Sequence, residues 1–282
     1  MTSVVCALVG TGCGGSAKHP ASPPVTRPRS TTPQSVATST AATTPTARTT
    51  TTAVVTSASD HQRDDSHAAA RAAERPSRAP ALLVTHIAGL GAAEQVIAVA
   101  TDGYGASTAT VTAYERGATG WKQVFGPWFA YIGRNGVAPV GAKREGDGRT
   151  PSGVYDFDFI FGVNADPGVH FPFRRITGAN IVWDDDSTST NYNRWIDTNT
   201  ASAGVSPEPM YTAPSDSYGV VIVYNDEHTS GLGSAMFLHV SHGSSTAGCV
   251  SLPRDDLLAL LRWLDPARSS RIAIGTLAHL SA

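Results

Sequence analysis

The chain has 282 residues and a formal net charge of −2, from 21 lysines and arginines against 23 aspartates and glutamates. This length suits one domain with a tail or two small domains. Because the charge is nearly balanced and forms no basic stripe, we expect no nucleic acid among the partners of the protein.

Residues 1–15 have the features of the end of an export signal. A short apolar run at 4–9 is followed by a glycine-rich stretch that contains Cys13. We therefore expect an exported protein, located in the cell wall or elsewhere outside the cytoplasm, with Cys13 as a candidate for lipid attachment. The apolar run is too short to span a membrane, so a lipid at Cys13 would be the only membrane contact.

Residues 16–81 consist mainly of Thr, Ser, Ala, Pro and Arg, with almost no large apolar side chains. Such a stretch cannot bury enough apolar surface to offset its ordering entropy, so we expect a disordered linker. Its composition is typical of a flexible-to-extended spacer, which would hold a domain away from a membrane. The alternative is a low-complexity extension without a role.

From residue 82 the sequence changes to short runs of β-forming residues separated by turns, which leaves roughly 190 residues for one globular domain. The runs predict strands at 94–100, 107–114, 121–131, 154–161, 219–224, 235–240 and 271–275. The stretch 162–217 is polar and irregular, and we expect Trp183 and Trp195 to anchor it.

One helix is predicted at 253–264. Pro253 stands near its start, two aspartates fall in its first turn and Pro266 follows its end. Its leucines recur at the spacing of a single apolar face, namely Leu257, Leu260, Leu261 and Leu264. The expected fold class is therefore mostly β, with one packed helix after the last cysteine.

Cys249 is the single cysteine of the expected domain, so it has no partner there for a disulfide. In an exported domain such a residue is a candidate reactive thiol. The alternative is a small buried hydrophobic residue.

Two histidines precede Cys249 and could serve as its base. His239 lies in the predicted strand 235–240, and His242 lies in the loop after it. We favour His239 as the base, with His242 as the rival; a core histidine is the alternative for His239. A zinc site formed by both histidines and Cys249 would match no common ligand spacing, so we expect no metal.

The residues around Cys249 suggest supporting roles. Thr246 could form a hydrogen bond within the same turn, and Gly248 would leave amides free to stabilise an oxyanion. The helix that begins near Pro253 would direct its positive end at Cys249 and favour a thiolate. Further side chains are expected to line the substrate cleft, namely Ser251, His242, Tyr192 and Asn193. For Tyr192 and Asn193 a structural loop is an equal alternative.

The segment 237–253 resembles the active-site signature of the L,D-transpeptidase (YkuD-type) catalytic domain family. In that signature an upstream His is followed by Ser/Thr-His-Gly-Cys, then an aliphatic residue and Arg or Asn. The matching positions are His239, Thr246, Gly248, Cys249 and Val250.

Ala247 and Ser251 depart from the signature, standing in place of the second His and of the Arg or Asn. A short-looped actinobacterial subgroup is similar in having Thr-Ala-Gly-Cys, and the stretch 145–155 resembles the Thr-Pro-x-Gly turn of the family. The similarity covers about 93–276, which we expect to be the catalytic domain.

The resemblance implies an L,D-transpeptidase-type β-sandwich that acts on peptidoglycan. Cys249 would attack the carbonyl between the third residue and the terminal D-Ala of a stem tetrapeptide, with His239 as general base and then general acid. An amine of a neighbouring stem peptide would resolve the acyl-enzyme and form a 3→3 cross-link. The partners would be stem peptides as donor and acceptor, no metal or organic cofactor is implied, and we expect a monomer.

Other functions remain open from the sequence. Water as the acceptor would make the protein an L,D-carboxypeptidase on wall tetrapeptides. A wall-binding module that keeps the fold without the chemistry is a second alternative, and a cysteine peptidase acting on proteins is a third.

Overall fold

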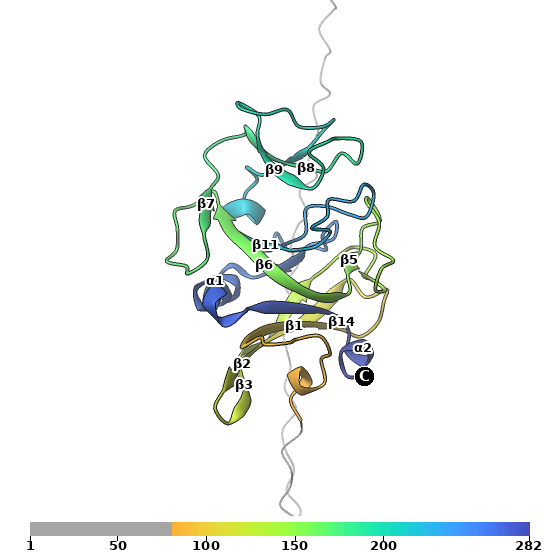
Figure 1. Ribbon diagram of the computed structural model, residues 1–282, viewed down its shortest axis with the longest axis vertical. Helices are drawn as coiled ribbons and strands as arrows, with labels where there is room; N and C mark the ends of the chain where they lie inside the picture. Colours follow the sequence, from red (N-terminus) through yellow and green to blue (C-terminus); the bar gives the residue numbers. More distant parts are fainter. Residues whose placement is uncertain (1–80) are drawn as a thin grey trace, which may run out of the picture. The chain divides into compact units, whose positions relative to one another are not determined.

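The computed structural model describes residues 81–282 (Figure 1). The expected signal segment, Cys13 and nearly all of the expected linker lie outside this range. Within residues 81–282, no helix is both long enough and apolar enough to cross a membrane.

Nine strands form the main sheet, in the order β11-β12-β13-β3-β2-β1-β14-β6-β7. The first strands along the chain are β1 (Gln95–Thr101), β2 (Thr108–Gly117), β3 (Gly120–Tyr131), β6 (Gly153–Gly162) and β7 (Phe173–Arg175). The others are β11 (Gly219–Ile222), β12 (Phe237–Val240), β13 (Val250–Leu252) and β14 (Arg271–Thr276). Because β11 also pairs with β6, the order closes on itself and β7 alone lies outside the ring.

Strand β1 lies between β2 and β14 and is buried on both faces, because a hydrophobic cluster covers each face. Side chains on a strand alternate between its faces. Ile97 and Val99 enter one hydrophobic cluster and Val96 and Ala98 enter another. The helix α1 (Arg254–Trp263) packs its leucines into the cluster of Ile97, as the apolar spacing predicted. The prediction of a mostly β domain with one packed helix is confirmed.

The second cluster extends beyond the expected domain at both ends. Val84 lies in the short helix η1 (Leu83–Thr85), and Leu280 lies in α2 (Leu277–Leu280). Both pack against β1 and β14, together with Ile87 and Leu90. The compact core therefore begins before residue 93 and ends after residue 276.

The stretch expected to be irregular contains a second sheet, so that expectation is wrong. Its strands are β8 (Ile181–Asp184), β9 (Arg194–Asp197) and β10 (Glu208–Pro209), in the order β10-β8-β9. Strands β8 and β9 stand above β6 and β11 in Figure 1. Trp183 and Trp195 are partners in its register and pack into the cluster of Phe237, as anchors should. Two further short strands, β4 (Val137–Ala138) and β5 (Thr150–Pro151), pair in parallel, and 3-10 turns lie at Ser215–Ser217 and Pro266–Arg268.

Candidate active site

Cys249 directly precedes β13, which runs parallel to β12. The register pairs Leu238 with Val250 and His239 with Ser251, so one further step places Phe237 opposite Cys249. Leu238 and Val250 belong to the cluster of α1, whereas Phe237 and Cys249 belong to the cluster of Trp183. Side chains alternate along a strand, so His239 and Cys249 share the second face as diagonal neighbours. Strand spacing and rise separate their Cα atoms by about 8 Å.

Both residues line a cavity of about 390 Å³. The neutral part of the lining around them includes Ala235, Met236, Thr246, Ala247 and Gly248. Its charged members are Arg134, Lys143, Glu145, Asp185, Glu208 and Asp216. The structure therefore places the predicted nucleophile and the predicted base at one solvent-accessible cavity.

The thiol of Cys249 is only 8% exposed and donates a hydrogen bond to the carbonyl of Ala235, with Sγ and O 3.2 Å apart. Burial, followed by the negative charge of Glu208, raises the pKa of Cys249 above its usual range. Ala235 has a φ of +53°, and its N–H donates to Oδ1 of Asn193 at 3.1 Å. The resting sulfur is therefore a protonated thiol held by a carbonyl, so the expectation of a resting thiolate is wrong.

His239 is buried and hydrogen bonded through Nδ1 to the carbonyl of Val240 at 2.9 Å. A carbonyl can only accept, so Nδ1 carries the proton and Nε2 is the nitrogen left to act as a base. Burial lowers the pKa of His239 to about 4; the Val240 carbonyl opposes this shift and nearby His242 adds to it. At neutral pH the ring is an uncharged base.

The predicted effect of the helix dipole on Cys249 is wrong, because β13 separates the cysteine from α1. The helix begins at Arg254, and the extended residues before it span about 13 Å from Cys249. The field of a helix end falls off within about one turn.

Thr246 organises the turn that carries the nucleophile. Its Oγ1 donates to the carbonyl of Cys249 at 2.6 Å and accepts from the N–H of Gly248 at 3.1 Å. The expected hydrogen bond within the turn is thus confirmed. Of the amides expected to be free to stabilise an oxyanion, that of Gly248 is not free, since it donates to Thr246.

Gly248 lies in a tightly packed part of the turn, with no room for a side chain. A Cβ there would lie 2.9 Å from Cε of Met236 and 3.0 Å from the carbonyl oxygen of Arg149. Glycine at this position therefore lets the turn pack against the wall of the cavity.

Of the four side chains expected to line the cleft, only His242 lines this cavity. Ser251 is fully buried and does not line it, and its Oγ has no hydrogen-bond partner in the described part of the chain. Tyr192 and Asn193 are buried as well, so the expected position of these three is corrected. The Tyr192 hydroxyl donates to Oε2 of Glu145 at 2.5 Å, and Asn193 accepts from the N–H of Ala235. Both residues therefore bind groups of the cavity lining without lining the cavity themselves.

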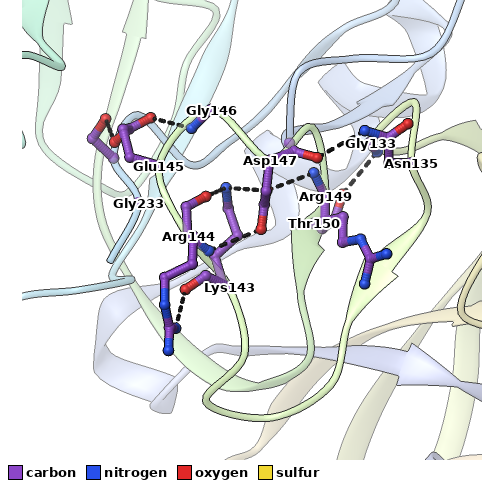
Figure 2. Close-up of polar contacts among 12 residues, drawn as sticks. Gly133, Asn135, Lys143, Arg144, Glu145, Gly146, Asp147, Arg149, Thr150 and Gly233 are labelled. Carbon is purple, nitrogen blue, oxygen red and sulfur yellow. Dashed lines mark hydrogen bonds and ion pairs between the residues drawn. The ribbon is translucent and has the colours of Figure 1, made fainter. Parts of the chain in front are cut away.

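The loop before β5 supplies charged residues that the sequence analysis did not single out (Figure 2). Lys143 is 3% exposed, and its Nζ donates to Oδ1 of Asp147 at 2.7 Å and to the carbonyl of Arg144 at 2.6 Å. Burial raises the pKa of Asp147, but the hydrogen bonds from Lys143 and two amides prevail and leave it lowered. The one signal in the sequence was their place just before the Thr150-Pro151 turn.

Three carboxyl groups from the 162–217 stretch line the same cavity, namely those of Asp185, Glu208 and Asp216. Burial raises the pKa of Asp216 to about 7, opposed by hydrogen bonds from Thr212. Glu208 is an exposed residue, yet the protein around its carboxyl group and then the charge of Asp216 raise its pKa to about 8. No sequence pattern marked Glu208 or Asp216, because the two-residue strand β10 and the three-residue 3-10 turn that carry them are too short to show a period. Within the described range, no three His, Cys, Asp or Glu side chains are grouped so that they could hold a metal ion.

Comparison with known proteins places this site in a family. The model of the YkuD L,D-transpeptidase catalytic domain matches residues 106–274, which is more than half of the chain. A solved structure, the helical cell shape determining protein Pgp2 from Campylobacter jejuni, is similar over 69% of this chain and 54% of that chain, with 14% identity and a TM-score of 0.33. The chain thus spans about half the length of that protein. No curated protein matches the sequence. The matched range contains β2 to β13, α1 and the cavity, and the chain belongs to the L,D-transpeptidase catalytic domain (YkuD) family.

Proposed function

We propose that this protein is an exported peptidoglycan L,D-transpeptidase that forms 3→3 cross-links through a cysteine acyl-enzyme. The family match supports an enzyme that acts on peptidoglycan. The observation that carries the finer proposal is the placement of Cys249 and His239 on one face of β12 and β13, at a cavity of about 390 Å³.

In the first half of the reaction, Sγ of Cys249 attacks the carbonyl between the third residue and the terminal D-Ala of the donor. Nε2 of His239 takes the thiol proton as the C–S bond forms. The proton then passes to the nitrogen of D-Ala as the C–N bond breaks, which leaves a thioester. Because the resting thiol points at the Ala235 carbonyl, it must first turn from that oxygen toward His239.

In the second half, a side-chain amine of a neighbouring stem peptide attacks the thioester. The new C–N bond forms, the C–S bond breaks, and His239 transfers the proton of the amine to the departing sulfur. Water in place of the amine would give a hydrolysed tripeptide, the L,D-carboxypeptidase reaction.

The test is product analysis by mass spectrometry after incubation with a tetrapeptide donor and an amine acceptor. We expect release of D-Ala and a product joined through the acceptor amine, both abolished in Cys249→Ala. His239→Gln should lose at least about a hundredfold in rate, the usual contribution of a general base. His242→Gln is the matched control and should retain activity.

Different results would change the assignment. Release of D-Ala without a joined product would identify a carboxypeptidase. Loss of activity in His242→Gln but not in His239→Gln would transfer the role of base to His242. Release that survives Cys249→Ala would overturn the cysteine mechanism.

This function requires the domain to be outside the cytoplasm, and we propose that residues 1–15 direct export. In this proposal the linker at 16–81 spans part of the wall, and Cys13 is the point of lipid attachment. Metabolic labelling with a clickable fatty acid, lost in Cys13→Ser, tests the anchor.

A further inference from the structure

The charged side chains around the cavity are unequal in number. Four carry carboxyl groups, namely Glu145, Asp185, Glu208 and Asp216, and only Lys143 and Arg134 are cations. A substrate with a free carboxylate would therefore find few positive charges along this wall. Such a substrate needs a cation that is not already paired with a carboxylate of the protein.

The ammonium group of Lys143 already has partners in the protein. Lys143 is buried, its ammonium forms an ion pair with Asp147 at 2.7 Å, and a second proton goes to the carbonyl of Arg144. Arg134 is exposed, and none of the carboxylates in residues 81–282 lies within ion-pair distance of its guanidinium. Arg134 is therefore the cation of the cavity lining that has its charge available.

Arg134 is also tied to the turn that carries the nucleophile. Its backbone N–H donates to the carbonyl of Thr246 at 2.8 Å, and Thr246 in turn holds the carbonyl of Cys249. The guanidinium lies against Gly148, where a Cβ would stand 2.9 Å from its Cζ. Gly148 has a φ of +67°, so both the backbone and the missing side chain make room for Arg134.

The donor of the proposed reaction ends in a carboxylate next to the bond that breaks. Standard bond lengths place this carboxylate within about 4 Å of the attacked carbonyl carbon. Ser251, two residues after the nucleophile, offers no cation there, since it is uncharged and fully buried. A guanidinium matches a carboxylate with two parallel hydrogen bonds.

We infer that Arg134 binds the terminal carboxylate of the donor peptide and selects donors that end in a free carboxylate. The inference rests on the proposed function and names a specificity residue of the same site.

The test compares two donors that differ in one group, a tetrapeptide with a terminal carboxylate and the same peptide with a terminal carboxamide. In Arg134→Gln, we expect kcat/KM for the carboxylate donor to fall about tenfold or more, mainly through KM, because a charged hydrogen bond is lost. The carboxamide donor should change less than about twofold. Arg134→Lys should recover part of the preference for the carboxylate donor, since lysine keeps the positive charge but cannot form the two parallel hydrogen bonds of a guanidinium.

Arg149→Gln is the matched control. Arg149 is exposed, follows Gly148 in the same loop and is not part of the cavity lining, so its replacement removes an equal charge without the proposed contact. It should leave the preference for the carboxylate donor unchanged.

Binding of both peptides to the Cys249→Ala protein, measured by calorimetry, separates this inference from the proposed function. If the carboxylate peptide binds and Arg134→Gln weakens both peptides equally or neither, the inference is overturned and the proposed function stands. If neither peptide binds and the unchanged protein releases no D-Ala, both the inference about Arg134 and the proposed function are overturned.

Discussion

Cys249 and His239 rest as a neutral pair for the same physical reason. Each is buried, and burial disfavours the charged form, so it raises the pKa of the thiol and lowers the pKa of the imidazole to about 4. The Ala235 carbonyl adds to this by accepting the thiol proton. Such a pair is protected from oxidation and alkylation until a substrate brings an electrophilic carbonyl to the sulfur. Proton transfer to His239 is then part of the attack.

We therefore expect slow alkylation of Cys249 in the absence of substrate. The rate with iodoacetamide should be below that of a free cysteine at pH 7 and should still increase above pH 9. His239→Gln should change the rate little near pH 7, because an uncharged ring does not stabilise a thiolate. The measurement is mass spectrometry of the Cys249 peptide, since the chain also has Cys6 and Cys13. A plateau below pH 7 that disappears in His239→Gln would instead indicate a thiolate–imidazolium pair.

Asp216 should make the stability of the fold depend on pH. Its folded pKa of about 7 lies above the ordinary value of 3.8, so its contribution to stability is complete below pH 4 and is lost as the pH rises to 7. The loss amounts to up to about 4 kcal/mol. Asp216→Asn keeps an acceptor for the Thr212 amide but has no charge, so its advantage in the free energy of unfolding should grow between pH 4 and 7 and then stay level. Urea unfolding of both proteins across this pH range measures the difference in free energy of unfolding. If that difference does not depend on pH, the titration of Asp216 is not its cause.

At the scale of the elements, the site depends on the turn between β12 and β13 more than on α1. Thr246 satisfies two backbone groups of this turn with one hydroxyl, and the loop after β3 holds the backbone of Thr246 through Ile132 and Arg134. The cavity wall and the nucleophile are thus parts of one hydrogen-bonded unit.

Thr246→Val should disturb this unit without changing its volume. The carbonyl of Cys249 and the N–H of Gly248 would lose their partner in a buried place, which costs about 1–3 kcal/mol. We expect a lower urea midpoint together with slower release of D-Ala. Thr246→Ser keeps the hydroxyl and should retain most of both properties. Equal losses in the two variants would show that the methyl group, not the hydrogen bonds, is what matters.

The hydrophobic pattern predicted the elements that have a single apolar face or a long apolar run. The leucines of α1 and the runs of β1, β6, β11 and β14 belong to this kind, and the structure has them close to the predicted bounds. Strand β13 was missed because its three residues carry no period and exist as a strand only through β12 and β3. The β8–β9 sheet was missed because side-chain contacts hold its connecting loops, such as Ser189 and Gly204 to Asp184.

The residues of the site likewise fall into those that the sequence predicted and those that it did not. Cys249, His239 and Thr246 lie close in sequence, so a local motif brought them together. The charged wall comes from segments more than thirty residues from Cys249, which come together only in the folded structure. A contact such as that of Tyr192 with Glu145 has no local signature in the sequence.

At the scale of the whole molecule, the closed sheet has a second core on its outer side. Val84, Ile87 and Leu90 pack there against β1 and β14, and Leu280 closes the other end. These residues lie outside both the matched range 106–274 and the region 93–276 that the sequence suggested. They cover strands that would otherwise expose apolar side chains to water.

A chain cut to 93–276 should therefore lose its stability, whereas one that spans 81–282 should not. Four buried aliphatic side chains contribute about 6 kcal/mol or more. That is comparable to the total stability of a domain, about 5–15 kcal/mol. We expect the shorter chain to lose its near-ultraviolet circular dichroism and its cooperative thermal transition. The longer chain should release D-Ala from soluble peptides at the rate of the full protein, since all three hydrophobic clusters lie within it. If the two chains melt within a few degrees of each other, the packing of the outer core on β1 and β14 is not needed for the stability of the domain.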